Sequence, residues 1–506
     1  MGQSRPKRAR EEAFMKKGLA LLLIIFLMTA CLTAAAEAVD SAPREDRLVV
    51  THHTATIQGQ EIAYTATAGT MAMSTALGDY DLFFVAYTLD GVEDPASRPI
   101  TFAYNGGPGA ASAYINLGLL GPDHLSLDEE GKIARVPTGY EPNDCSLLDL
   151  TDLVFIDPVG TGYSRAAGET DANVFYSYPT DIQSVGDFII QYINRNQRWA
   201  SPKYLAGESY GTTRTAGLCS YLMEQCHVNL NGLMMVSSIN NYASAHFGEG
   251  NDLPYAGFLP TYAAIAHYHG KVADEYRDVE LEAFLDEVRD FAGGEYWSAL
   301  FKGSRLMDDE KGALAEKIAG YTGLKKELIL RKNLRIDMDT FCTELLGDQN
   351  LFVGRVDGRY TGPAVAGSIE DAVADPSATT TAAYIEAAQD LYTRKLQYRA
   401  DVSYEALSLA VNAAWTFPGQ QNAILSQERI LHDCMSKNPL MKVWVICGYY
   451  DLATPFFAAE WTYSHLFLSE DLQDNLSFTY YPSGHMFYQH EPSLRQFRAD
   501  AEAWFG

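Results

Sequence analysis

The segment Lys203 to Leu222, KYLAGESYGTTRTAGLCSYL, constrains the fold of this chain more than any other stretch. Lys203 to Ala206 is typical of a strand end, Gly207 to Gly211 of a sharp turn, and the residues from Thr212 onward of a helix. The glycines at both ends of the turn are needed because so tight a strand-to-helix turn leaves no room for side chains. Such a turn lifts the Ser209 hydroxyl to the end of a sheet, at the positive end of the next helix, where a nucleophile is useful. With 40 glycines in the chain, the pattern also arises by chance, so the partners of a nucleophile must be sought elsewhere.

Apolar runs and amphipathic stretches alternate on both sides of this segment. Residues 47–90 alternate in short runs between glycines, which predicts antiparallel strands at one edge of a sheet. Further on, the expected strands are Pro99 to Tyr104, Leu153 to Ile156, Leu233 to Ser237, Lys442 to Cys447 and Ser477 to Tyr481, and the expected helices include Tyr178 to Asn194 and Ser493 to Phe505. This order predicts an α/β fold with a mostly parallel central sheet and helices on both faces.

The alternation is interrupted by a long stretch without central strands. Residues 240–435 have a predominantly helical pattern, and such a length is too great for a simple crossover between two strands. We therefore expect a helical cap inserted between two parts of an α/β core, 39–239 and 436–506.

The first 38 residues have the three regions of a secretory signal. Lys16 and Lys17 precede the apolar run Leu19 to Met28, and small residues follow. The run is too short to span a membrane as a mature helix. The segment 1–38 therefore predicts export. The signal is then either removed or, as the competing interpretation, followed by lipid attachment at Cys31.

Charge and cysteine spacing exclude several classes of partner. The formal net charge of -27 argues against nucleic acid and anionic membranes as partners. No Cys-x-x-Cys pair or His-Glu-x-x-His motif occurs, and the pairs His52-His53 and His267/His269 are interpreted as loop or cap histidines rather than metal ligands. No P-loop or dinucleotide fingerprint is present, so we expect no metal and no cofactor. The sequence leaves the oligomeric state open.

Two later strands also end in loops with chemically active residues. Asp451 follows the strand Lys442 to Cys447, and His485 lies in YPSGHMFY after the next strand. An imidazole can take the proton of Ser209 only if an acceptor holds its other nitrogen, and Asp451 is the candidate for that acceptor. The chain order Ser, Asp, His at successive strand ends is the order of α/β-hydrolases.

With these motifs the chain resembles the serine carboxypeptidases, an α/β-hydrolase family with a large helical insertion, and more narrowly a bacterial branch of it. The matching motifs are NGGPG at Asn105, FIDPVGTGYSR at Phe155, GESYG at Gly207, GYYDLATP at Gly448 and SGHMFY at Ser483.

The resemblance implies roles for individual residues. Ser209 is the expected nucleophile, His485 the general base and acid, and Asp451 the group that orients the imidazole. The oxyanion hole is expected to use the backbone N–H groups of Gly107 and Tyr210, because one donor follows the nucleophile and the other comes from an exposed glycine loop.

The resemblance also implies how a substrate is held. Asn105, Gly106 and Glu208 are expected to bind the terminal carboxylate of a peptide, Glu208 as a protonated donor. Three positions depart from the family: Ala103 replaces the usual Trp, Leu119 replaces a Glu that often partners the carboxylate-binding Glu, and Ala110 replaces the Cys after NGGPG. The expected activity is exported carboxypeptidase action on peptide or protein C-termini. An esterase or acyltransferase using the same triad, or a catalytically inactive hydrolase used for binding, are the alternatives.

Overall fold

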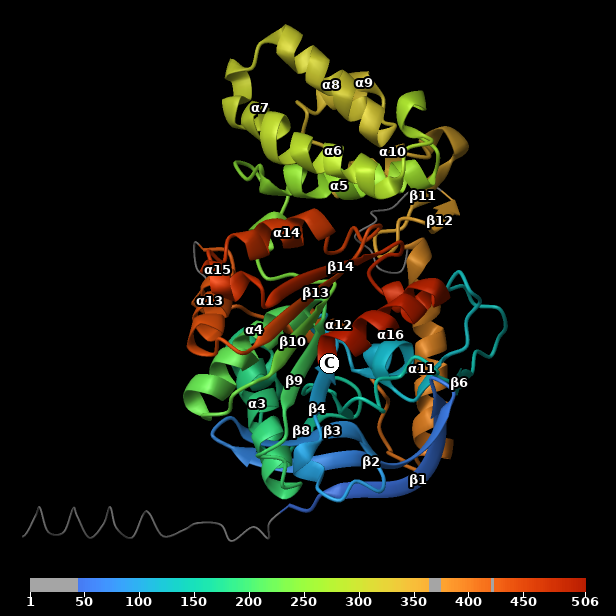
Figure 1. Ribbon diagram of the computed structural model, residues 1–506, viewed down its shortest axis with the longest axis vertical. Coiled ribbons are helices and arrows are strands. Elements are labelled where there is room, and N and C mark those ends of the chain that lie inside the picture. Colours follow the sequence, from blue (N-terminus) through green and yellow to red (C-terminus); the bar gives the residue numbers. More distant parts are fainter. Residues whose placement is uncertain (1–43, 364–374, 420–422) are drawn as a thin grey trace, which may run out of the picture. The chain divides into compact units, whose positions relative to one another are not determined.

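The computed structural model describes residues 44–363, 375–419 and 423–506 (Figure 1). The segment 1–38 and Cys31 lie outside the described residues, so the expectations of export and lipid attachment stay predictions. Residues 46–506 pack as one unit. Within the described ranges, no helix combines the length and apolarity needed to cross a membrane.

A ten-stranded sheet runs through this unit in the order β1-β2-β3-β7-β4-β9-β10-β13-β14, with the short β8 paired to β3. The pairings from β1 to β7 are antiparallel, and all pairings from β7 to β14 are parallel. The expectation of a mostly parallel sheet with antiparallel strands at its N-terminal edge is confirmed. The strands of the sheet are β1 Arg47–Ile57, β2 Gln60–Thr75, β3 Gly78–Leu89, β4 Ile100–Tyr104, β7 Asp152–Ile156, β8 Arg165–Ala166, β9 Lys203–Glu208, β10 Gly232–Val236, β13 Lys442–Gly448 and β14 Leu476–Tyr481.

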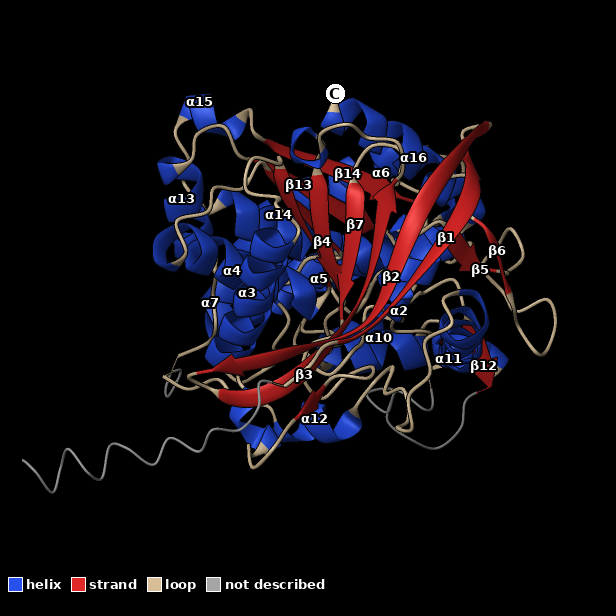
Figure 2. Ribbon diagram, turned by 90° about the horizontal axis from the view of Figure 1, so that it is seen from below, coloured by secondary structure: helices blue, strands red, loops and turns tan. Residues whose placement is uncertain are grey.

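Helices cover both faces of the sheet, and β13 shows why they must. Val443 and Val445 join one apolar cluster with α3, α4 and α13, whereas Trp444 and Ile446 join a second cluster with α11 and α16. Successive side chains of a strand point to opposite faces, and all four are buried, so each face needs a helical layer. Figure 2 shows the strands between these helices. The helices around the sheet are α2 Ala113–Ile115, α3 Tyr178–Arg195, α4 Tyr210–Ser220, α11 Thr381–Asp390, α12 Leu409–Ala414, α13 Glu428–Lys437, α14 Phe456–Ser464, α15 Glu470–Gln473 and α16 Glu491–Phe505.

The stretch expected to form a cap is divided between two places. Its first part forms a helical group, in which α5 packs on α14 of the sheet region (Figure 1). Its later part returns to the sheet, where α11 packs beside α2 and α13 beside α4. The group comprises α5 Leu253–Tyr268, α6 Leu281–Phe291, α7 Trp297–Lys302, α8 Asp308–Thr322, α9 Lys326–Arg331 and α10 Met338–Glu344, followed by the hairpin of β11 Leu351–Val353 and β12 Thr361–Pro363. A second hairpin joins β5 Asp123–Leu125 to β6 Tyr140–Pro142. The division of the chain at residues 239 and 435 stays a prediction.

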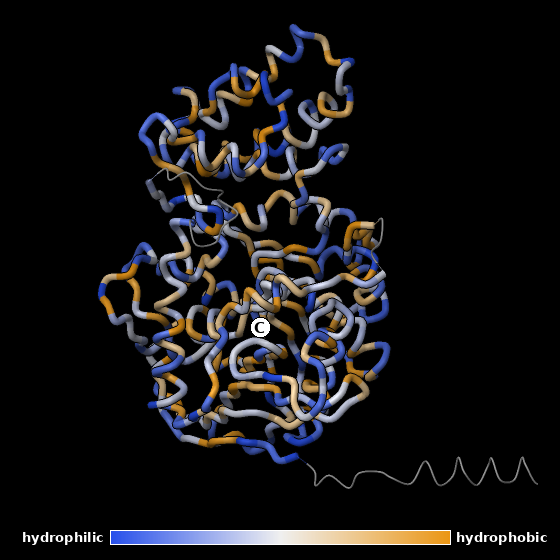
Figure 3. The backbone as a smooth tube through the Cα atoms, turned by 180° about the vertical axis from the view of Figure 1, so that it is seen from behind, coloured by the Kyte–Doolittle hydropathy of each residue, from blue (hydrophilic) through white to orange (hydrophobic). Residues whose placement is uncertain are grey.

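Apolar burial, without disulfides, holds the described part of the chain together. Two clusters of buried apolar side chains, one on each face of the sheet, form its core. Figure 3 shows how hydrophobic (orange) and hydrophilic (blue) stretches alternate along the chain. The six cysteines in the described residues are free thiols. Cys226 is partly exposed, and the other five are buried: Cys145, Cys219, Cys342, Cys434 and Cys447.

Candidate active site

Ser209 occupies a one-residue turn between strand and helix. β9 ends at Glu208, α4 begins at Tyr210, and Ser209 between them has φ 59° and ψ -130°. This backbone is strained for a residue with a side chain, as expected at a nucleophile elbow. A Cβ on Gly207 would lie 2.3 Å from the carbonyl oxygen of Gly211, so the turn closes only with glycine there. The expected turn from Gly207 to Gly211 is therefore too wide: the positive φ of Ser209 reverses the chain within a single residue.

Asp451 and His485 meet in the loops that follow β13 and β14. Nδ1 of His485 lies 2.7 Å from Oδ2 of Asp451, whose side chain is fully buried. The backbone N–H groups of Ala453 and Thr454 donate to Asp451 Oδ1 at 2.7 and 2.9 Å, and the Thr454 hydroxyl donates to Oδ2 at 2.7 Å. These bonds fix the carboxylate as an acceptor aimed at the imidazole.

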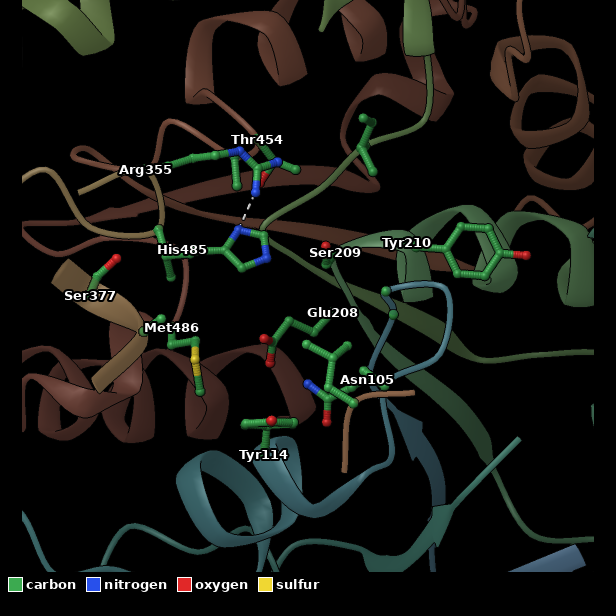
Figure 4. Close-up of a pocket in the computed structure, with 18 of the residues that line it drawn as sticks. Asn105, Tyr114, Glu208, Ser209, Tyr210, Arg355, Ser377, Thr454, His485 and Met486 are labelled. Atoms are coloured by element: carbon green, nitrogen blue, oxygen red, sulfur yellow. Dashed lines mark hydrogen bonds between the residues drawn. The ribbon is translucent and has the colours of Figure 1, made fainter. Parts of the chain in front are cut away.

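Ser209 and His485 line one cavity of about 370 Å³. Figure 4 shows the His485 ring turned toward Ser209, with Glu208 and Asn105 on one side of the ring and Thr454 on the other. Among the bonds of the described residues, none joins the Ser209 hydroxyl to His485. Catalytic hydrogen bonds are often long without a substrate and tighten when one is bound.

The pKa of His485 is set by burial and by Asp451. Burial disfavours the imidazolium, but the Asp451 carboxylate and its hydrogen bond outweigh burial, and the pKa of His485 rises above 6.5. The imidazole is therefore a stronger base than a free histidine, and it accepts a proton only where the pH exceeds this raised pKa.

Two residues with free backbone donors, Gly107 and Tyr210, line the cavity together with Ser209. Tyr210 N–H is at the first position of α4, and Gly107 N–H belongs to the loop after β4; in the described residues neither donates to a protein acceptor. A Cβ on Gly106 would lie 2.4 Å from the Tyr210 nitrogen, so glycine here lets the loop pack directly on the elbow. Free N–H groups in the same cavity as the nucleophile are suited to stabilise an oxyanion.

A buried ion pair fixes this loop to α4. Arg214 Nε donates to Asp181 Oδ2 at 2.9 Å, and its Nη1 donates to the carbonyl oxygen of Asn105 at 2.6 Å. The Tyr210 hydroxyl donates to the same Asp181 oxygen at 3.0 Å. Asn105 is also held through its side-chain oxygen, which accepts from Ile115 N–H at 2.9 Å, so its amide nitrogen is the group that faces Glu208.

Glu208 is buried at the cavity floor and is held in the neutral form at moderate pH. Burial is the main cause that raises its pKa to about 7, and nearby His485, Tyr488 and Asn105 oppose that rise. The Tyr488 hydroxyl donates to Glu208 Oε2 at 2.8 Å. Below about pH 7 the protonated carboxyl can donate a hydrogen bond into the cavity.

Sequence reasoning missed Tyr488 as the partner of Glu208. Leu119, at the position where the family that this chain resembles often has a Glu, is buried. Tyr488 donates its hydroxyl to Glu208 instead. A Cβ on Gly118 would lie 2.2 Å from the Tyr488 ring, so Gly118 provides the space in which this ring sits. The tyrosine in SGHMFY, three residues after His485, was the signal available in the sequence.

Thr454 and Arg355 are further residues of this cavity that the sequence did not single out. His267 and His269, which the sequence analysis did not interpret as metal ligands, bond to backbone carbonyl oxygens. The distances from their Nε2 atoms are 3.1 Å for His267 and 2.8 Å for His269. In the described ranges, no group of three or more His, Cys, Asp or Glu side chains is arranged to hold a metal ion.

Comparison with known proteins gives a family match to part of the chain. Residues 58–304 match the family model described as serine carboxypeptidase. This segment contains Asn105, Glu208 and Ser209, whereas Asp451 and His485 lie beyond it.

Curated relatives match over a similar segment. The chain is 30% identical to serine carboxypeptidase-like 29 of Arabidopsis thaliana over 196 residues, which are 38% of this chain and 36% of the plant protein. It is 29% identical over 200 residues to the pheromone-processing carboxypeptidase KEX1 of Yarrowia lipolytica, covering 38% of this chain and 29% of the yeast protein. The match thus spans about a third of each relative. Both sources are eukaryotic, so the bacterial branch stays a prediction.

A solved structure shares the fold over most of the chain. The prohormone-processing carboxypeptidase Kex1 of Saccharomyces cerevisiae superposes with a TM-score of 0.55 at 16% identity, covering 87% of this chain and 91% of that one. The α/β-hydrolase fold is confirmed by this likeness.

Proposed function

We propose that this chain, whose family match and curated relatives support membership of the serine carboxypeptidase family, releases single residues from peptide C-termini through an acyl-enzyme. The observation that carries the proposal is the geometry of one cavity. It contains Ser209, a histidine held at 2.7 Å from a buried Asp451, and a buried Glu208.

In the proposed reaction the Ser209 hydroxyl attacks the carbonyl carbon of the last peptide bond. His485 Nε2 takes the hydroxyl proton, and Asp451 stabilises the resulting imidazolium. The N–H groups of Gly107 and Tyr210 donate to the oxygen that becomes negative. His485 then gives its proton to the leaving amine, and a water molecule, activated in the same way, hydrolyses the acyl-enzyme.

Specificity for a chain end requires a group that binds the terminal carboxylate. We assign this to Asn105, Gly106 and protonated Glu208, with Tyr488 positioning Glu208 through its 2.8 Å hydrogen bond. A neutral carboxyl donates to the substrate carboxylate, whereas an ionised one repels it.

Mass spectrometry of peptide products tests this function. A linear peptide should lose residues one at a time from its C-terminus, whereas the same peptide with a C-terminal amide should react far more slowly. A head-to-tail cyclised peptide of the same sequence should stay intact. Internal fragments would contradict carboxypeptidase action. Hydrolysis of esters with no peptide product would instead support the esterase that Ala103 and Leu119 leave open.

Glu208→Gln should change the pH dependence of peptide hydrolysis. In the wild type, kcat/KM for peptides should fall as pH rises above about 7, because Glu208 then loses the proton that it donates to the substrate. On the acid side kcat/KM should fall as His485 becomes protonated below its raised pKa. Gln keeps a donor and cannot ionise, so the variant should lose the alkaline fall and keep the acid one.

A substrate without a terminal carboxylate provides the control for this profile. Hydrolysis of a blocked ester should show no fall that depends on Glu208, in either the wild type or the variant. An identical peptide profile in both proteins would mean that Glu208 only braces the turn, and the carboxylate would have to be bound elsewhere.

We also propose that the protein is exported and that residues 240–435 restrict access to the cavity. The signal-like composition of residues 1–38 supports export. Access control is supported by cavity-lining residues from this segment, which include Tyr242, Ser377 and Leu407.

A further inference from the structure

Arg355 is held between the two loops that carry Asp451 and His485. Its carbonyl oxygen accepts from Leu452 N–H at 3.0 Å, and the carbonyl oxygen of the next residue, Val356, accepts from His485 N–H at 2.7 Å. The N–H groups of Arg355 and Val356 both donate to Asp375 Oδ2, at 3.0 and 3.2 Å. The backbone of Arg355 is therefore fixed relative to the catalytic cavity.

The side chain of Arg355 has no anionic partner in the described part of the chain. No hydrogen bond or ion pair of its guanidinium is found among the described residues, although it is only partly exposed. Arg359, in the same loop, shows the contrast: its guanidinium donates to both oxygens of Asp357 and to Ser483. A partly desolvated guanidinium that lacks such a partner is suited to bind an anion from outside the chain.

The guanidinium lies on the side of His485 opposite to Glu208. Figure 4 shows Arg355 reaching toward Thr454, across the imidazole from Glu208 and Asn105. Its positive charge opposes the rise in the pKa of His485, which reflects its proximity to the ring. Arg355 also lines a second cavity of about 460 Å³, which shares Ile239 and Ala453 with the first.

This placement separates two possible anions of a peptide. On the proposed function, the terminal carboxylate and the released residue lie at Glu208 and Asn105. The chain on the acyl side of the scissile bond must then leave past the other side of His485, toward the second cavity. An anion presented to Arg355 is therefore a side-chain carboxylate of the residue that precedes the scissile bond.

We propose that Arg355 is a specificity-determining residue that binds the Asp or Glu side chain of the penultimate residue of the substrate. The inference rests on the proposed function and names its preferred substrate class. A bidentate guanidinium–carboxylate contact is directional, so a neutral amide of the same shape gains much less from it.

Matched peptides that differ only in the penultimate residue test the proposal. In the wild type, kcat/KM for the Glu peptide should exceed that for the Gln peptide by roughly 10- to 100-fold, the range for a hydrogen bond between charged groups. Arg355→Gln should remove this preference mainly by slowing the Glu peptide. Arg355→Glu should reverse it in favour of a penultimate Lys. Arg429→Gln, which removes the same charge from a side chain that is 92% exposed, should leave the preference unchanged.

Equal rates for the Glu and Gln peptides in the wild type would overturn the proposal. A preference for Glu only as the released residue would also overturn it, because that residue lies on the Glu208 side. Binding of both peptides to Ser209→Ala, measured by calorimetry with and without Arg355→Gln, separates this inference from the proposed function. If binding of the Glu peptide depends on Arg355 but the wild type does not cleave it, only the proposed function is contradicted. If binding does not depend on Arg355, the inference is contradicted, even if the wild type cleaves peptides.

Discussion

Ser209→Ala is expected to lower kcat for peptides and esters alike by roughly 10⁶-fold, to the level left by the oxyanion donors and substrate binding. The acyl-enzyme cannot form without the hydroxyl, and no second hydroxyl stands at the strained turn between Glu208 and Tyr210. Single-turnover assays with an ester and a peptide measure the loss, and mass spectrometry of trapped protein should show the acyl adduct only in the wild type.

The thermal unfolding midpoint of Ser209→Ala should stay close to that of the wild type or rise. Ser209 has a positive φ, which costs free energy in either protein, and its hydroxyl makes no hydrogen bond in the described residues that the variant would lose. Ser469→Ala, an exposed serine whose side chain makes no capping bond at α15, is the matched control and should keep full activity. Turnover of Ser209→Ala within a few fold of the wild type would refute the assignment of the nucleophile.

Asp451→Asn is expected to lower kcat by about 10⁴-fold while the fold is kept. Ala453 N–H and Thr454 N–H donate to Asp451 Oδ1, so the carbonyl oxygen of an Asn would take that position. Its NH₂ group would then point at His485 Nδ1 and force that nitrogen to accept. The proton of the neutral imidazole would move to Nε2, the atom that must take the proton of Ser209.

The pH profile identifies this cause. Without the carboxylate that raises the pKa of His485, the acid limb of the residual activity should shift to lower pH. Asp348→Asn, at a side chain that is 61% exposed, changes the same atoms and should alter neither rate nor profile. A loss of activity in Asp451→Asn with an unchanged acid limb would indicate misfolding of the loop rather than a wrong tautomer.

Much of the sheet could be predicted because its strands are buried on both faces. Such strands are continuous apolar runs, and those predicted at Leu153 to Ile156 and Lys442 to Cys447 differ from β7 and β13 by one residue at one end. Asp451 and His485 lie in the loops after β13 and β14, and they meet because these two parallel strands end at the same edge of the sheet.

Contacts between distant parts of the chain could not be predicted in this way. Tyr488 and Glu208 are 280 positions apart, and their meeting depends on how the loop after β14 returns across the sheet edge. Arg355 belongs to a short hairpin within a stretch that was expected to be helical. No pattern in the sequence shows that the guanidinium of Arg355 lacks an ion-pair partner in the described residues, whereas that of Arg359 is paired with Asp357.

The strand order also determines when the cavity can be completed. β9 and β10 lie inside the sheet, whereas β14 is its last strand and pairs only with β13. On the proposed roles, a nascent chain that has already formed the Ser209 turn still lacks a base, because His485 follows β14. In such a chain on the ribosome, Ser209 would have no base to activate it. The same would hold for a chain in which β14 has detached from β13. Peptidase activity would therefore report the docking of the last strand, and incomplete copies of the protein would not cleave their neighbours.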